Sequence, residues 1–142
     1  MFLIASLLFA APAAAASAKP ANVVSIAISG LRNARGTVRV CMTRQRAHFP
    51  GCQKDPAALA GSSPATAPTV EITGVAPGDY AIAVFQDEND NLKLDTMMGI
   101  PREGFGFSRN PKIRFGPPKF DEVRVTVPPG GLRTSVKLKY LL

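Results

Sequence analysis

Apolar residues recur along this chain with a period of two. Alternation of apolar and polar positions gives a β-strand one buried and one exposed face, whereas an amphipathic helix needs a period of 3.6. Short alternating stretches run over residues 24–28, 38–42, 70–72, 80–84, 123–127 and 136–140. The pattern therefore predicts a chain of six or seven strands, with no sustained helical stripe.

Turn-forming residues separate these stretches. The chain holds 13 prolines and 12 glycines, which end strands and permit tight turns. We expect an all-β fold, a single antiparallel β-sandwich of about seven strands of the immunoglobulin-like or transthyretin-like kind. Residues 75–79 predict a hairpin between the flanking strands, and the Pro- and Ala-rich residues 55–68 predict a loop.

Tyr80 follows the turn at residues 75–79 directly. In sandwich folds a tyrosine at this kind of corner can bond back across the connection through its hydroxyl. An ordinary core tyrosine is the alternative.

The first 18 residues differ from the rest of the chain. They carry no charge, contain an apolar run from Phe2 to Ala10, and end in small residues that fit a signal-peptidase site. We interpret residues 1–18 as a signal peptide, with a retained N-terminal anchor as the alternative. Residues 19–142 would then form one β-sandwich domain that is periplasmic or secreted, with no stable membrane insertion after cleavage.

The two cysteines fit an oxidising destination. We expect Cys41 and Cys52 to form a structural disulfide, since disulfides persist in exported proteins. The strand alternation turns Cys41 away from the core, so the bridge would hold residues 43–51 against the outer side of its strand. A free or redox-active pair is the alternative, and no Cys-x-x-C motif favours it.

Charge is distributed unevenly over the chain. The formal net charge is +7, yet residues 87–95 hold four carboxylates and one lysine, a local net charge of −3. Outside the cytoplasm a basic surface favours loose attraction to anionic envelope polymers. We expect no nucleic-acid partner, because the chain has no Trp and no interleaving of basic and aromatic residues.

The acidic stretch has the spacing of a calcium-binding loop. Oxygen-bearing side chains stand at positions 1, 3, 5 and 9 counted from Asp87, and position 7 would contribute its backbone carbonyl. Glu103 could add a carboxylate if the chain folds back. We therefore predict a Ca²⁺ site formed by Asp87, Asn89, Asn91, Lys93, Asp95 and Glu103.

Two positions depart from this loop pattern. Leu92 stands at position 6, where the turn normally takes Gly, and Met98 replaces the bidentate Glu of position 12. A left-handed backbone costs a bulky residue about 1–2 kcal/mol. The alternative is a solvated acidic turn whose Asp and Asn side chains bond to the local backbone.

Phe105 and Phe107 alternate with glycines in the segment that follows. They either cap the end of the sandwich as core residues or, with Arg102 and Arg109, form an exposed ligand-binding platform for a carbohydrate or a peptide. We expect no enzyme. His48 has no partner at a catalytic spacing, and the chain contains neither G-x-S-x-G nor H-E-x-x-H.

Four motifs together resemble a known family. They are GTVRV from Gly36, PGDYAIAVF from Pro77, DENDNLKLD from Asp87 and GIPREGFGFS from Gly99. Over residues 23–138 the chain is similar to the exported bacterial family catalogued as domain of unknown function 2141. The resemblance implies a small exported β-sandwich without an established activity. The family loop usually carries glycine where this chain has Leu92.

Three functions follow as hypotheses. The first is a non-enzymatic envelope module in which a cation orders the acidic loop and positions Phe105 and Phe107 to meet an envelope component. The second is a purely structural accessory domain of the envelope. The third is a metal-assisted hydrolase, for which His48, Glu88 and Glu103 are the candidate titratable groups.

Overall fold

The computed structural model describes residues 10–11, 22–114 and 116–142, so nearly all of the predicted signal peptide lies outside the described residues. None of the described helices is long and apolar enough to cross a membrane. The described strands are β1 (Val24–Ser29), β2 (Thr37–Thr43), β3 (Leu59–Pro64), β4 (Thr69–Ile72), β5 (Gly78–Asp87), β6 (Thr96–Met97), β7 (Ile100–Pro101), β8 (Phe105–Phe107), β9 (Val125–Val127) and β10 (Leu132–Lys137). The helical turns are η1 (Arg46–His48), η2 (Cys52–Lys54) and α1 (Phe120–Val123).

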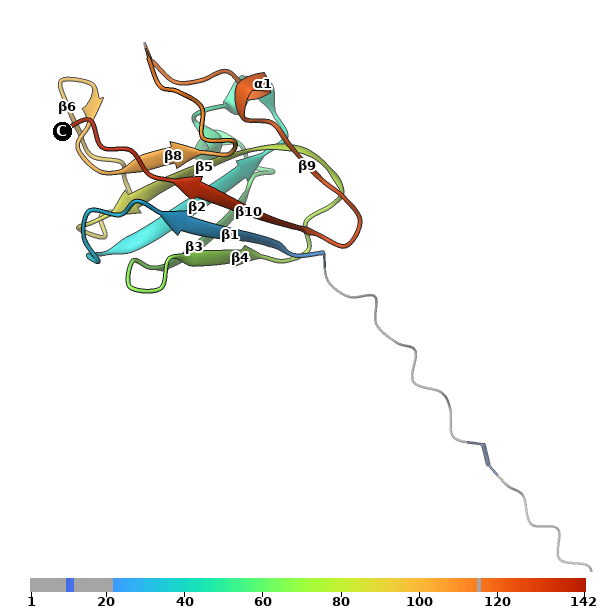
Figure 1. Cartoon of the computed structure of the whole chain (residues 1–142). Helices are drawn as coiled ribbons and strands as arrows, with labels where there is room; N and C mark the ends of the chain where they lie inside the picture. Colours follow the sequence, from blue (N-terminus) through green and yellow to red (C-terminus); the bar gives the residue numbers. More distant parts are fainter. Residues whose placement is uncertain (1–9, 12–21, 115) are drawn as a thin grey trace, which may run out of the picture.

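The strands form two facing sheets, as the β-sandwich prediction requires (Figure 1). One sheet has the order β10-β1-β4, and the other has the order β3-β2-β5-β8 with β9 paired to the start of β5. A separate small hairpin joins β6 to β7. The all-β sandwich is thus confirmed.

One pairing differs from the expected antiparallel arrangement. β1 and β10 run parallel, with Val24 opposite Leu132. The turn at 128–131 brings the start of β10 beside the start of β1, where Leu132 N–H donates to the carbonyl of Val23 (3.0 Å). Gly131 has φ 94° there, and a Cβ on it would lie 2.1 Å from that carbonyl oxygen. Glycine is therefore required at this close approach.

The main core lies between the two sheets. Alternate residues of each strand point inward, so the predicted period of two corresponds to real burial. This inner core contains Val24, Ile26, Ile28, Val38, Val40, Met42, Val70, Ile72, Val75, Tyr80, Ile82, Val84, Val127, Val136 and Leu138.

The predicted hairpin across residues 75–79 is wrong. β4 pairs with β1, and β5 pairs with β2, so the connection carries the chain from one sheet to the other. Tyr80 marks this crossing: its hydroxyl donates to the carbonyl of Ala76 (2.7 Å). The tyrosine-corner alternative is thereby confirmed, and a corner between sheets replaces a hairpin within one.

The predicted loop at residues 55–68 is also wrong at residues 59–64, because β3 lies there and pairs with β2. Two of its inward positions, Gly61 and Ser63, are small, so the apolar alternation that identifies the other strands is missing. The space is nevertheless filled. A Cβ on Gly61 would come within 2.8 Å of the Val70 side chain from the opposite sheet.

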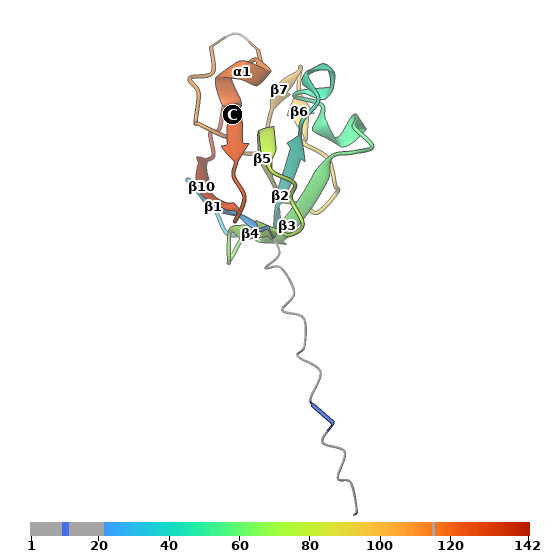
Figure 2. The same cartoon turned by 90° about the vertical axis from the view of Figure 1, so that its right-hand side faces the viewer.

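A second apolar cluster covers part of the outer face of the β3-β2-β5-β8 sheet. It contains Ala81, Phe85, Phe105, Phe107, Phe120 and Val123. α1 lies at one end of the molecule near the start of β9 (Figure 2). This second cluster reaches only part of the sheet, and the uncovered part carries the candidate site.

Candidate functional site

A disulfide connects the outer face of β2 to the segment that follows it. Cys41 and Cys52 are bonded, with Cα atoms 6.0 Å apart and a sequence separation of 11. Cys41 points away from the inner core, as the alternation predicts, and both residues are buried. The structural-disulfide prediction is confirmed, and the bridge holds η2 beside the sheet.

Asp87 begins the acidic loop and is fully buried. Its Oδ2 accepts hydrogen bonds from Arg39 Nε (2.7 Å) and from the backbone N–H of Leu92 (2.8 Å). Its Oδ1 accepts from the N–H of Asn91 (3.1 Å). Burial alone would raise the pKa of Asp87, but these hydrogen bonds and the Arg39 charge outweigh it and hold the pKa below its usual value.

Glu103 folds back onto the loop, as the calcium prediction supposed. Its Oε2 accepts from the backbone N–H of Glu88 (2.6 Å) and its Oε1 from that of Asp95 (2.9 Å). Glu88 itself is paired with Arg32 Nε (2.8 Å), and this hydrogen bond is the main cause of its lowered pKa. The carboxylates of Glu88 and Glu103 are therefore both held by hydrogen bonds from other residues of the chain.

The outer half of the loop gathers the remaining predicted ligands. Asn89 Nδ2 donates to Asp95 Oδ2 (2.7 Å), and Asn91 Nδ2 donates to Asp95 Oδ1 (2.6 Å). The exposed Lys93 donates its backbone N–H to Asn91 Oδ1 (3.0 Å). Within the described residues, no group of three or more His, Cys, Asp or Glu side chains is placed to hold a metal ion.

Leu92 adopts the backbone conformation that the loop pattern assigns to glycine. Its φ is 68°, and its side chain is 70% exposed. Leu94, two residues on, packs against the second cluster and anchors the loop. The loop thus keeps its turn at position 6 in spite of the substitution.

The aromatic platform expected as one alternative does not form. Phe105 and Phe107 lie on β8 with 8% of each residue exposed, and they belong to the second cluster. Their ring centroids are 6.1 Å apart, and Phe107 also contacts Phe49 edge-on. The core-capping alternative is correct, because pairing of β8 with β5 places both rings beside Phe85 among the other residues of the second cluster.

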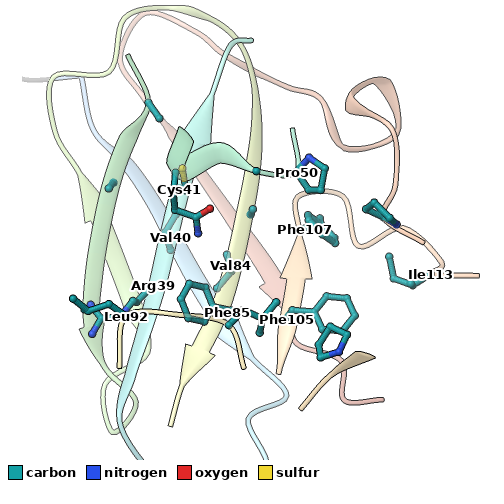
Figure 3. Close-up of a pocket in the computed structure, with 18 of the residues that line it drawn as sticks. Arg39, Val40, Cys41, Pro50, Val84, Phe85, Leu92, Phe105, Phe107 and Ile113 are labelled. Atoms are coloured by element: carbon teal, nitrogen blue, oxygen red, sulfur yellow. The ribbon is translucent and has the colours of Figure 1, made fainter. Parts of the chain in front are cut away.

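A groove remains on the outer face of the same sheet (Figure 3). Its volume is about 1090 Å³, slightly above the range of about 300–1,000 Å³ that is usual for ligand sites. Two rows of neighbouring residues form the floor. Paired positions across β3, β2, β5 and β8 place Ala60, Cys41, Ala83 and Phe107 in one row, and Ser62, Arg39, Phe85 and Phe105 in the other.

The walls of the groove come from three loops. Pro50 and Gly51 belong to the segment held by the disulfide, Ile113 and Arg114 precede α1, and Leu92, Leu94 and Ile100 form the end near the acidic loop. Figure 3 shows Phe107 beside Ile113, with Arg39 and Leu92 at the opposite side of the opening. The groove is therefore mainly apolar, with two arginines at its edge.

Sequence patterns missed this groove. The available signal was the small or apolar character of Cys41 and Ala83 at outward positions, where a solvated strand face normally carries polar residues. The groove also depends on pairing between β3 and β2, which was not predicted. The small outward residues were therefore visible in the sequence, but they could not be assigned to a groove without the pairing of β3 with β2.

A family model matches most of the chain, and this match identifies the family. The model of the family described as "Uncharacterized protein conserved in bacteria (DUF2141)" matches residues 26–135. The chain belongs to this family. The DUF2141 span runs from β1 to β10 and includes the whole floor of the groove and the acidic loop. No curated protein and no solved structure matches the chain.

Proposed function

We propose that this DUF2141 chain is a non-enzymatic binding module that holds the hydrocarbon chain of an amphiphile in the outer-face groove. The observation that carries the proposal is the groove itself. Its central floor residues, Cys41 and Ala83, are small, and Phe85, Phe105 and Phe107 supply apolar surface beside them. Transfer of a hydrocarbon chain from water to such a surface is favourable by roughly 25 cal/mol per Å².

A hydrocarbon chain fits this floor better than a peptide does. The floor strands β2 and β5 are paired on both sides, β2 with β3 and β5, and β5 with β2 and β8. A peptide on this floor would find few free backbone partners for its amides, and unpaired buried amides are costly. The pairing of both floor strands therefore favours an aliphatic ligand over a peptide.

The edge of the groove favours an anionic head group. Arg39 and Arg114 line the opening. Arg39 is neutralised by Asp87 (2.7 Å), whereas the exposed Arg114 forms no ion pair with any described residue. A fatty acid with its carboxylate near Arg114 therefore suits both the apolar floor and the charge of the rim.

The geometry around the acidic loop supports a binding role rather than a catalytic one. The oxygens of Glu88 are held by Arg32 and Asn33, and those of Glu103 by two backbone N–H groups. A general acid or base must be able to reach a reacting proton.

We also propose that the protein is periplasmic or secreted. The disulfide supports this location, because disulfides persist in oxidising compartments.

Binding of a fluorescent fatty acid to the mature chain tests the groove. Ala83→Phe would fill the floor, and we expect it to weaken binding at least tenfold while the domain stays folded. Ala60→Phe, at an exposed position in the same row, gives a second variant with less risk to folding. Ala27→Phe is the matched control, because Ala27 is exposed on β1 in the other sheet.

Two outcomes would overturn this proposal. One is the absence of saturable fatty-acid binding at concentrations below micelle formation. The other is equal affinity for the Ala83→Phe, Ala60→Phe and Ala27→Phe variants, which would place the fatty acid outside the groove.

Calcium at the acidic loop is the second candidate function. The side-chain amides of Asn89 and Asn91 both donate to the Asp95 carboxylate. Rotation of each amide group by half a turn would direct its oxygen, instead of its nitrogen, toward that carboxylate. Asp87 would contribute less than the spacing suggests, because Arg39 already holds one of its oxygens. We propose a weak site centred on Asn89, Asn91 and Asp95, with the carbonyl of Lys93 as a further ligand.

Thermal melts with calcium and with chelator test this second candidate. A ligand of the folded state stabilises by RT ln(1 + [L]/Kd), about 2.7 kcal/mol at a hundredfold excess over Kd. We expect a rise in melting temperature that Asp95→Asn removes and Asp121→Asn, which changes a carboxylate within α1, leaves in place. No shift with calcium or magnesium would contradict a cation site.

A further inference from the structure

Three exposed large apolar side chains line the groove at its end near the acidic loop. They are Leu92, Ile100 and Leu141. Each comes from a different segment: Leu92 from the acidic loop, Ile100 from β7, and Leu141 from the residues after β10. Exposed apolar side chains that three separate segments bring to one groove indicate a surface for a ligand.

Leu92 occupies its place in the groove at a cost to folding. Its backbone has φ 68°, a left-handed conformation that strains a bulky residue. Its N–H donates to Asp87 Oδ2 (2.8 Å), and the same oxygen accepts from Arg39 Nε (2.7 Å). The loop therefore holds Leu92 next to Arg39, as Figure 3 shows. Because the Leu92 side chain stays mostly in water, contact with a ligand accounts for it better than folding does.

The position of Leu92 relative to the basic edge of the groove sets a minimum length for the ligand. Ile113, which precedes Arg114, packs in the second cluster beside Phe107 on β8 (Figure 3). Leu92 lies by Arg39 on β2, and β5 separates β2 from β8. Phe107 and Arg39 belong to neighbouring rows of the floor. Two strand spacings and one row give a separation of about 12 Å.

This separation corresponds to a hydrocarbon chain of medium length. An extended chain advances roughly 1.3 Å for each carbon–carbon bond. A fatty acid whose carboxylate lies at Arg114 therefore needs about ten carbons to reach Leu92. Octanoate would end above the floor, whereas dodecanoate would reach the far end of the groove.

We propose that Leu92, Ile100 and Leu141 bind the methyl end of the hydrocarbon chain and select fatty acids of about ten carbons or more. This inference rests on the proposed binding of a fatty acid in the groove, and it adds the chain length and the residues that recognise it. A chain that covers these three side chains removes their apolar surface from water, which favours binding. A shorter chain leaves them exposed.

Affinities of the mature chain for octanoate and dodecanoate test this selectivity. Each is measured by displacement of a fluorescent fatty acid, below micelle formation and with a chelator present, so that no cation acts on the acidic loop. We expect Leu92→Gly to weaken dodecanoate binding by about tenfold and octanoate binding by less than about twofold. Ile100→Thr, which keeps a β-branched residue in β7, should also weaken dodecanoate more than octanoate.

Met98→Gly is the matched control for Leu92→Gly. Met98 is also apolar, exposed and left-handed, with φ 54°, but its side chain does not line the groove. We expect Met98→Gly to leave both affinities unchanged. Thermal melts of both variants complete the comparison. Because glycine relieves the left-handed backbone, Leu92→Gly should not lower the melting temperature, and its loss of affinity then reflects a lost ligand contact.

Three results would overturn the chain-length inference and leave the fatty-acid groove in place. The first is an equal loss of octanoate and dodecanoate affinity in Leu92→Gly. The second is unchanged dodecanoate affinity in both Leu92→Gly and Ile100→Thr. The third is a loss in Met98→Gly as large as that in Leu92→Gly. Absence of saturable binding of either fatty acid to the unaltered chain would instead overturn the proposed function, and this inference with it.

Discussion

The two faces of the β3-β2-β5-β8 sheet are built from the same strands but are covered differently. The inner face is closed by the β10-β1-β4 sheet, and its alternating Val, Ile and Met residues are almost fully buried. The outer face has only the second cluster and the short segments around it. Where these end, Cys41 and Ala83 form the floor of a groove.

This difference shows that apolar character on a strand has two uses. Large branched residues on the inner face fill space and stabilise the fold. Small residues on the outer face leave space, which is what a ligand needs. Changes on the two faces should therefore affect different measurements.

The largest expected effect on stability lies on the inner face. Ile82 is fully buried in the middle of β5, and Ile82→Ala should lower the free energy of unfolding by about 4 kcal/mol, through lost transfer energy and a residual cavity. Fatty-acid affinity should stay within about threefold at temperatures where the variant is folded. Urea denaturation and ligand titration of the same samples make this check. Loss of fatty-acid affinity in a folded Ile82→Ala variant would show that the inner and outer faces do not act independently.

Reduction of the disulfide should act on both stability and the groove. Cys41 lies in the floor, and the bridge holds the segment that carries Pro50 and Gly51 in the wall. Opening this loop should lower stability by about 3 kcal/mol and weaken fatty-acid binding. Chemical denaturation with and without dithiothreitol measures the first effect. Unchanged affinity in the reduced, folded protein would mean that the wall does not contact the ligand.

Asp87 should give a stability effect that depends on pH. Its pKa is lowered in the folded state, so its contribution is present above the unfolded value of about 4 and is lost as pH falls through the folded value. Asp87→Asn should therefore cost about 3 kcal/mol at pH 7, because Arg39 loses its partner, and this cost should shrink as the pH falls below the unfolded value of about 4. Urea denaturation at pH 7 and at a series of lower pH values tests this.

The control for Asp87→Asn is Asp121→Asn, because Asp121 forms an exposed pair with Arg46 that should contribute little. Equal costs for the two variants at pH 7 would contradict the assigned role of the buried carboxylate.

The smallest effect is expected at Leu92. Leu92→Gly relieves the left-handed backbone at φ 68° and should change stability by no more than about 1 kcal/mol, in the stabilising direction. The same variant restores the residue usual in the family loop, so its calcium response sharpens the second candidate function. A marked loss of stability would show that the exposed Leu92 side chain packs more tightly than its exposure indicates.

The sequence predicts the inner face well and the outer face poorly. Alternation identified β1, β2 and β5 because their inward residues are large and apolar, and it placed Cys41 on the opposite side. β3 was missed because Gly61 and Ser63 carry no apolar signal. The sheet-crossing connection before Tyr80 was interpreted as a hairpin, because turn residues alone do not distinguish pairing within a sheet from passage between sheets.

The acidic loop was predicted in its spacing but not in its contacts. The turn at Leu92 and the return of Glu103 to the loop followed from the loop pattern. The pairing of Asp87 with Arg39 did not, because the two residues are 48 positions apart and meet only through the β2–β5 register. Long-range register is also what brings together the rows of the groove.

Nuclear Overhauser contacts between dodecanoate and the methyl groups of the protein would show whether a hydrocarbon chain lies in the outer-face groove. We predict contacts from the ligand methylenes to Ala60, Ala83 and Ile113, and none to Ala27 on the other sheet or to Ile82 on the inner face. Contacts to Ala27, or none to Ala83 at saturating dodecanoate, would contradict the proposal that the outer-face groove holds a hydrocarbon chain.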